Sequence, residues 1–379
     1  MQMLEATAKG LLERAGIAVP HGAFLERGQR SDALPAAFCE GTVWVKAQVP
    51  MTKRLANGGI RRASGAAEID CALDEMERAG VGGISPLGFL VEEHVAARSE
   101  LFLGLVFDPL ERRPVLVVSA TGGSEVEGGA RVGRVAWSPL YPLYGYQVRE
   151  ACSVAGVSPE PLIGVAQRLA ELYCAQDATL LELNPLFLTE DGSCVAGDVH
   201  LIVDDNAEFR HPEWSPESER LALVDESLDV RLRYGFDYAV IDPEGEVGLL
   251  TTGAGATMLI IDELARRGAR VLNFADIRTG GLKGDATRLL AVVDRLLVAP
   301  RVRAVFINVF GGVTDTAEVA QLLVADVLPK LCARVAVTVR LVGRGGEQAR
   351  EVLREARLPI HILEDLDEAV RVTVEACRS

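Results

Sequence analysis

The chain has 379 residues, which predicts two or three domains, and 49% of the residues are apolar, enough to form sizeable cores. Its net charge of −15 excludes a general nucleic-acid-binding surface. Any nucleotide site must therefore be a local basic pocket in an acidic protein.

Seven cysteines are scattered along the chain without CxxC spacing, which excludes a zinc site and a disulfide framework. We interpret them as reduced, mostly buried thiols of a cytosolic protein. The N-terminus lacks a basic segment followed by a long apolar core, so no signal peptide is expected. No apolar run approaches the roughly 20 residues of a membrane span. These features predict a cytoplasmic location.

A helix is predicted over residues 4–15, where apolar side chains recur at helical spacing. Residues 42–49 read as an apolar strand with Lys46 in its middle. A lysine is costly to bury unless an anion meets it, so we favour an anion-binding role over a place on a solvated strand face. The loop over residues 50–59 follows, and its Lys53, Arg54 and two glycines could close over phosphates. Taken alone, such a loop is more often a surface turn.

The next part of the chain predicts an antiparallel sheet between two helices. The helices are expected at residues 66–79 and 159–175, and the strands at 89–95, 99–106 and 114–119. The first two strands are predicted to pair with each other. Residues 122–129, rich in glycine and glutamate, are expected to form a mobile loop.

An apolar strand at residues 180–186 is followed by a hairpin turn at Asp191-Gly192 and a partner strand that ends at Asp198. Glu182 and Asn184 have the same parity and share one face of the first strand. The Asn184 amide and the Asp198 carboxylate offer hard oxygen ligands, which suit Mg²⁺. An ordinary buried strand with a polar end explains the hairpin equally well.

Residues 212–238 are predicted to be a linker, because charges and prolines replace periodicity there. Beyond it, strands alternate with helices, which predicts a doubly wound parallel sheet and an α/β class. These strands are expected at residues 247–251, 270–274, 304–310, 335–341 and 360–363. Glycine turns at residues 253–255 and 311–312 fall at the carboxyl ends of two strands. Each would expose backbone N–H groups to an anion, although close helix–strand packing explains either turn alone.

Taken together, these segments resemble the beta subunits of succinyl-CoA synthetases, in the ADP-forming acyl-CoA ligase group. The resemblance covers nearly the whole chain, and its motifs occur in the expected order. The two most specific motifs are Glu182-Leu183-Asn184-Pro185-Leu186 and Asn308-Val309-Phe310-Gly311-Gly312. The others lie at residues 45–49, 90–92, 100–104, 206–210 and 253–255.

The resemblance implies an α+β ATP-grasp domain over residues 1–235 and a flavodoxin-like CoA-ligase domain over residues 236–379. It assigns Glu182 as the catalytic carboxylate, which steadies a phosphohistidine, and Asn184 and Asp198 as the Mg²⁺ ligands. The ATP or ADP site is implied at Lys46, Lys53, Arg54, Leu55, Glu92, Val95 and Glu100. The acid substrate is implied at Thr252, Gly312, Val313 and Thr314.

The reaction implied is acid + CoA + ATP giving acyl-CoA + ADP + phosphate, reversibly. The phosphohistidine and the CoA site belong to an alpha subunit in this family, and none of the five histidines of this chain is assigned a catalytic role. Leu55, Val95 and Thr252 depart from the family pattern. The alternatives are therefore a ligase for malate or citrate, or a catalytically silent paralogue that binds only a nucleotide or a partner. The sequence does not decide between ATP and GTP.

Overall fold

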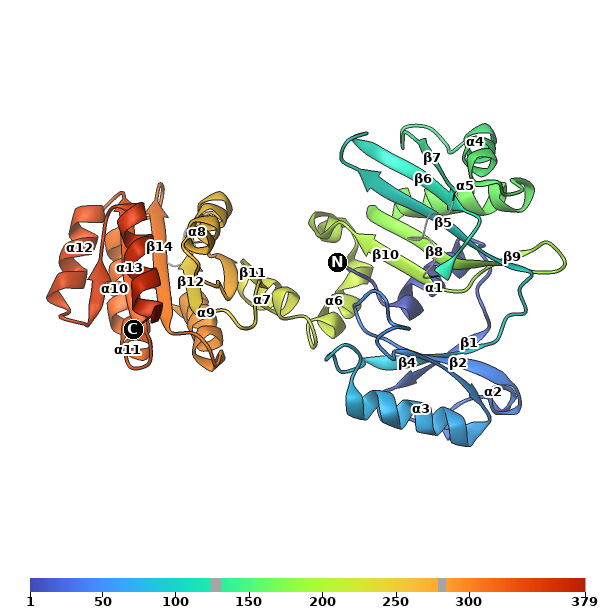
Figure 1. The fold of residues 1–379 in the computed structure, drawn as a ribbon, viewed down its shortest axis with the longest axis horizontal. Helices are drawn as coiled ribbons and strands as arrows, with labels where there is room; N and C mark the ends of the chain where they lie inside the picture. The colour runs from blue at the N-terminus through green and yellow to red at the C-terminus, as the bar shows by residue number, and fades with distance from the viewer. Residues whose placement is uncertain (124–130, 279–283, 379) are drawn as a thin grey trace. The chain divides into compact units, whose positions relative to one another are not determined.

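The computed structural model describes residues 1–123, 131–278 and 284–378, and the chain divides into two compact units, residues 1–224 and 225–379. Figure 1 shows the elements of each unit. Residues 124–129 of the loop predicted to be mobile lie outside the described residues. Among the helices described, none has the length and apolar character that crossing a membrane requires.

The first unit begins with a four-stranded antiparallel sheet in the order β1-β4-β2-β3. Its strands are β1 (Gly22–Glu26), β2 (Thr42–Ala47), β3 (Ile60–Ser64) and β4 (Gly88–Glu93). Helices α2 (Ala36–Glu40) and α3 (Ala66–Ala79) cover one face (Figure 1). Phe38 and Leu73 from these helices pack on Val45 and Val91 of the sheet. The helix predicted at residues 66–79 is confirmed.

A second antiparallel sheet has the order β10-β8-β5-β6-β7, with β9 paired to β8. Helices α4 (Gly145–Ala155) and α5 (Glu160–Ala175) pack against it. The strands are β5 (Ser99–Asp108), β6 (Arg113–Ser119), β7 (Val132–Ala136), β8 (Ala178–Leu188), β9 (Cys194–Ala196) and β10 (Val199–Val203). The predicted hairpin after residue 186 is confirmed by the β8–β9 pairing.

The predicted pairing of residues 89–95 with residues 99–106 is wrong. β4 lies between β1 and β2, whereas β5 pairs with β6 and β8 in the other sheet. Apolar periodicity identifies a strand but not its partner, and here the short connection between the two strands crosses from one sheet to the other.

Helix α1 (Glu5–Arg14) packs on β10 and α5 through Ala8 and Leu12. Two side chains from distant segments fix its N-terminus. The backbone N–H of Leu4 donates to Glu217 Oε1 at 2.7 Å, and that of Ala6 donates to Gln48 Oε1 at 2.9 Å. These bonds satisfy amide groups that have no partner within the helix, and so they set its position.

The linker predicted at residues 212–238 contains the division between the two units, but it is not an irregular chain. The segment contains α6 (Ser215–Leu221), α7 (Glu226–Tyr234) and the start of β11 (Asp237–Val240). Two of its acidic side chains cap helices. Glu217 caps α1, and Asp225 accepts hydrogen bonds from the first turn of α7.

The second unit contains a parallel sheet in the order β12-β14-β15-β16. Its strands are β12 (Val247–Thr251), β14 (Ala304–Gly311), β15 (Ala336–Gly343) and β16 (Ile360–Ile362). A bridge from Val247 to Val271 attaches the segment leading into β13 (Asn273–Asp276) on the other side of β12. The order is then that of a flavodoxin-like doubly wound sheet, with its first crossover strand at the edge.

Helices cover both faces of this sheet, as predicted. Helices α8 (Ala254–Arg266) and α13 (Leu366–Arg378) pack on one face. The opposite core includes α9 (Thr287–Val298), α10 (Thr316–Leu322), α11 (Leu328–Leu331) and α12 (Gly346–Glu355). The strand predicted at residues 270–274 is displaced to 273–276, where it pairs antiparallel with β11.

The cysteines are all free thiols, but the expectation that most are buried is wrong. Cys152 and Cys377 are buried, whereas Cys71 and Cys174 are exposed. Helical periodicity places a small apolar residue near a core without deciding whether it faces inward.

Close packing of α4 on β7 generates the first prediction. A Cβ atom on Gly133 would lie 1.8 Å from the carbonyl oxygen of Ala151, so Gly133→Ala forces backbone to move. We expect a loss of about 1–3 kcal/mol or more in the unfolding free energy of the first unit. Urea unfolding followed by tryptophan fluorescence measures it, because Trp44, Trp137 and Trp214 all belong to that unit. Gly41→Ala, which meets nothing within 4 Å, is the control, and equal losses would contradict the account.

Candidate functional site

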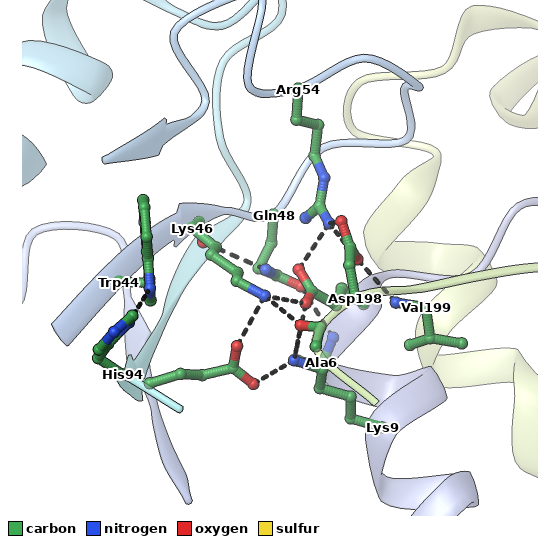
Figure 2. A network of polar contacts seen from close by, with 12 residues as sticks. Ala6, Lys9, Trp44, Lys46, Gln48, Arg54, His94, Asp198 and Val199 are labelled. Atoms are coloured by element: carbon green, nitrogen blue, oxygen red, sulfur yellow. Dashed lines mark hydrogen bonds and ion pairs between the residues drawn. The ribbon is translucent and has the colours of Figure 1, made fainter. Parts of the chain in front are cut away.

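Six charged side chains from different parts of the first unit meet in one cluster. We call this set the ion cluster. It comprises Glu5 and Lys9 of α1, Lys46 of β2, Arg54 of the following loop, Glu92 of β4, and Asp198 between β9 and β10. Figure 2 shows Lys9, Lys46, Arg54 and Asp198 converging on one another. Four of these six residues were predicted from the sequence as site residues.

The two lysines share the same acceptors. Lys46 Nζ lies 2.7 Å from Glu5 Oε1, 2.6 Å from the carbonyl oxygen of Gly197 and 2.7 Å from Glu92 Oε2. Lys9 Nζ lies 2.9 Å from Glu5 Oε1 and 2.8 Å from the same carbonyl, and it also pairs with Glu92. An ammonium group has three donors, so both lysines are fully satisfied. Because Gly197 precedes Asp198, the lysines also fix the backbone next to that carboxylate.

Arg54 lies between two carboxylates. Its Nη2 atom is 2.6 Å from Glu5 Oε2 and 2.7 and 2.9 Å from the two oxygens of Asp198. Its Nη1 atom donates to the carbonyl oxygen of Ala47 at 3.3 Å. The Asp198 Oδ1 atom also accepts from the backbone N–H of Val199 at 2.7 Å. Arg54 is buried, whereas Asp198 keeps 25% of its side chain exposed and remains accessible from outside the protein.

Three positive and three negative side chains make the ion cluster neutral in formal charge. Burial alone would raise the pKa of Glu5, but Arg54, Lys46 and Lys9 together hold it well below its usual value. Burial would lower the pKa of Lys46, yet Glu5 and Glu92 raise it above its ordinary value. The pKa of Lys9 is lowered, because burial and the charge of Lys46 both disfavour its ammonium form. Lys46 therefore stays charged, as a phosphate-binding group requires.

Of the two predicted metal ligands, Asn184 lies on β8 and Asp198 lies in the short connection between β9 and β10. The backbone N–H of Asn184 donates to the carbonyl oxygen of Asp198 at 3.1 Å. The side-chain oxygen of Asn184 accepts from the backbone N–H of Gly123, in the loop after β6. Nowhere in the described residues do three histidine, cysteine, aspartate or glutamate side chains gather as metal ligands. An amide oxygen and a carboxylate are nevertheless the kinds of ligand that Mg²⁺ takes, and two suffice because that ion keeps several waters and takes further oxygens from phosphates.

Glu182 faces His200 across the β8–β10 pair. Its Oε1 atom lies 3.4 Å from His200 Nδ1, and both side chains are partly exposed. The other ring nitrogen of His200 is buried without a hydrogen-bond partner in the described part of the chain. Sequence reasoning assigned no role to His200, and its place opposite Glu182 was predictable only once the register was known.

The remaining residues predicted for the nucleotide site lie at the surface or near it. Lys53 and Leu55 are exposed on either side of buried Arg54, and Leu55 is 64% exposed. Glu100 is exposed on β5, where its carbonyl oxygen accepts from the N–H of Gly122 at 2.9 Å. Val95 is half-buried after β4. Glu92, by contrast, lies inside the ion cluster, so its contacts are with lysines.

Glu5 and Lys9 were not predicted as site residues. They sit four residues apart on α1, on the same face as the buried Leu12. A pair of opposite charges on the apolar face of a helix is a signal that each has a buried partner elsewhere. That signal was present in the sequence.

In the second unit, Thr252 lies where β12 and β14 end. It is buried, its N–H donates to the carbonyl oxygen of Asn308 at 3.2 Å, and its hydroxyl accepts from the N–H of Phe310 at 3.3 Å. The prediction that the turn at residues 253–255 offers free amide groups is wrong. The N–H groups of Gly253 and Ala254 donate to the Asp276 carboxylate at 2.6 and 3.0 Å.

The helix after the second glycine turn begins at Thr316, and the Asp315 carboxylate caps it by accepting from the N–H of Ala317. Gly312 and Val313 are exposed and Thr314 is half-buried, and all three directly follow the carboxyl end of β14. The Asp276 and Asp315 carboxylates accept hydrogen bonds at the starts of the two helices, and their negative charge would repel an anion bound there.

Comparison with known proteins identifies related sequences over the full chain. A family model described as an ATP-grasp domain matches residues 2–188. The chain is 34% identical to the beta subunit of the ADP-forming succinate–CoA ligase of Ignicoccus hospitalis, covering 100% of both chains. It is 33% identical to the beta subunit of the GDP-forming enzyme of Thermus thermophilus, covering 99% and 98%.

Among solved structures, an ATP citrate lyase from Methanothrix soehngenii has a similar fold. The TM-score is 0.70 at 17% identity, and the match covers 99% of this chain and 100% of that one. At this identity the likeness concerns the fold alone.

The contacts of Glu5 generate the second prediction. Glu5→Gln leaves three buried cations facing two anions, and we expect it to lower the unfolding free energy of the first unit by about 3–5 kcal/mol at pH 7. The folded-state pKa of Glu5 is depressed, so its stabilisation is present above its unfolded value of about 4.3 and is lost as the pH falls through the folded value.

The gap between wild type and Glu5→Gln should therefore shrink as urea unfolding is repeated at pH values below about 4. Glu13→Gln, which changes an exposed carboxylate of the same helix, is the matched control. A loss no greater than that of the control would show that the ion cluster contributes nothing to stability.

Proposed function

Since the chain belongs to the family of succinate–CoA ligase beta subunits, we propose that it supplies the nucleotide site of an ADP-forming succinate–CoA ligase. The reaction is succinate + CoA + ATP giving succinyl-CoA + ADP + phosphate, reversibly. The observation that supports this most is the convergence of Lys46, Arg54 and Asp198 from three separate segments. A phosphate-binding pair of cations beside a carboxylate is what a magnesium–nucleotide site needs.

The roles follow from charge and position. Lys46 and Arg54 would bind the phosphates, and Asn184 and Asp198 would hold Mg²⁺. When bound, that ion supplies neutralisation of the phosphate charge. Lys53, Leu55, Val95 and Glu100 would lie around the nucleotide, as the resemblance implies. The contacts of Glu92 with both lysines support a role in holding Lys46 in place within the nucleotide site.

Phosphoryl transfer is then assisted by positioning and charge, not by covalent catalysis on this chain. Glu182 would steady the imidazole of a phosphohistidine presented by the partner. A beta subunit implies a partner chain, and we assign that partner as an alpha subunit that carries the histidine and binds CoA. The domains at residues 1–235 and 236–379 and the cytoplasmic location remain part of this proposal.

The acid would be held at the carboxyl edge of the second unit by Thr252, Gly312, Val313 and Thr314. We favour succinate over malate or citrate because of the family. A relative of nearly equal similarity is GDP-forming, so nucleotide binding is tested with GTP as well as ATP.

A second candidate is a silent paralogue that binds a partner without turning over nucleotide. One observation favours it: all three donors of Lys46 are taken by acceptors within the protein. A phosphate must displace one of these acceptors before Lys46 can bind it. Nucleotide titration separates the two candidates.

The third prediction concerns nucleotide binding. Isothermal calorimetry should show saturable binding of Mg²⁺–ATP or Mg²⁺–GTP to the full chain. Lys46→Ala and Asp198→Asn should each weaken it about tenfold or more, because each removes a charge from the site. Asp32→Asn, at an exposed aspartate of the same unit, is the control. No binding of either nucleotide would favour the silent paralogue.

The fourth prediction concerns the acid. Together with its cognate alpha chain, the protein should release ADP or GDP in a coupled assay that contains CoA and succinate. Malate and citrate should give lower kcat/KM than succinate. A preference for either would correct the substrate while leaving the enzyme class in place, and no turnover with any acid would reject the ligase.

A further inference from the structure

Arg54 contacts both oxygens of Asp198, the carboxylate to which a divalent ion is proposed to bind. One guanidinium nitrogen lies 2.7 Å from Oδ1 and 2.9 Å from Oδ2 of Asp198, so both oxygens face the same positive group. The Oδ1 atom also accepts a hydrogen bond from the N–H of Val199. An ion approaching Asp198 therefore meets a cation already in contact with each oxygen.

Mg²⁺ binds carboxylate oxygens at about 2.1 Å and requires near-octahedral space around itself. A guanidinium at hydrogen-bond distance from the same two oxygens takes up part of that space, and two adjacent cations repel each other strongly in a partly buried site. Binding of Mg²⁺ to Asp198 is therefore opposed by Arg54.

Arg54 has a second anchor that does not depend on Asp198. The Nη2 atom is 2.6 Å from Glu5 Oε2, and Nη1 donates to the carbonyl oxygen of Ala47. The backbone of Arg54 is also held, since its carbonyl oxygen accepts from the N–H of Gly59 at 2.7 Å. A small movement of the guanidinium away from Asp198 can therefore occur without releasing the loop.

Phosphate oxygens are strong, bidentate acceptors for arginine. A nucleotide phosphate near the ion cluster would draw Arg54 from Asp198 and at the same time supply the oxygens that Mg²⁺ lacks at Asn184 and Asp198. Both effects favour the ion only when the nucleotide is present.

We propose that Arg54 and Mg²⁺ compete for Asp198, so that the divalent ion enters this site together with a nucleotide and not before it. This inference rests on the proposed function, because it takes Asp198 as the metal carboxylate. It gives Arg54 two alternating partners, the Asp198 carboxylate and a phosphate.

The fifth prediction tests the competition with Mn²⁺, whose free aqueous ion gives an electron paramagnetic resonance signal that is lost on binding. The wild-type full chain should bind Mn²⁺ alone weakly. Arg54→Gln should bind Mn²⁺ alone about tenfold to a hundredfold more tightly, because one charge-assisted contact to the ligand is gone. Arg54→Lys, which keeps the positive charge, should stay close to wild type.

Two further variants make the outcome specific. Arg54→Gln combined with Asp198→Asn should lose the gain, which places the ion at Asp198. Arg62→Gln removes one positive charge at an exposed arginine of β3, away from Asp198, and this variant should bind Mn²⁺ like wild type. Tryptophan fluorescence verifies that Arg54→Gln is folded. If Arg54→Gln does not fold, Mn²⁺ titration of wild type with and without ADP replaces it, and wild type should bind Mn²⁺ more tightly when ADP is present.

The results separate the two claims. If wild type binds Mn²⁺ alone as tightly as Arg54→Gln does, or as tightly as it does with ADP present, the competition is refuted while the nucleotide site stands. If Mn²⁺ with ADP binds equally to wild type and Asp198→Asn, the metal site itself is misplaced and the proposed function fails at that point.

Discussion

The ion cluster depends on Glu5. Its carboxylate is the one group in the cluster that contacts three cations, Lys9, Lys46 and Arg54, and it lies on a helix whose N-terminus is fixed by Gln48 and Glu217. Three buried cations without this anion would repel one another at close range. The Glu5 carboxylate of α1 therefore brings Lys46 and Arg54, the two candidate phosphate-binding groups, close together and favours their charged forms.

A common feature links the two units. At two positions where a charged ligand is predicted to bind, the chain supplies a countercharge of its own. Arg54 lies on the Asp198 carboxylate, and the Asp276 carboxylate lies on the amide groups of Gly253 and Ala254. Such internal pairs lower the cost of keeping charged groups out of water. They also mean that a ligand must replace a partner instead of filling an empty position.

Local patterns predicted most of the elements, but not how they associate. The helix at residues 66–79 and the hairpin after Leu186 follow from periodicity and turn residues, and the doubly wound sheet follows from strand–helix alternation. The pairing of β4 with β1 and β2 does not follow from local patterns, because an apolar strand could be buried equally well in either of the two sheets. Lys46, Asp198 and Arg54 were identified from local chemistry. Glu5 and Lys9 were missed although their opposite charges on an apolar helix face were a local signal, and only their distant partners could not be read from the sequence. His200 was missed because its place depends on strand register.

The central claim is that Lys46, Arg54, Asn184 and Asp198 form one magnesium–nucleotide site. A crystal structure of the full chain with Mg²⁺ and ADP tests it most directly. The account predicts that the ion is bound by the Asp198 carboxylate and the Asn184 amide, with Arg54 moved onto a phosphate. A nucleotide bound elsewhere, with Arg54 still on Asp198, would contradict it.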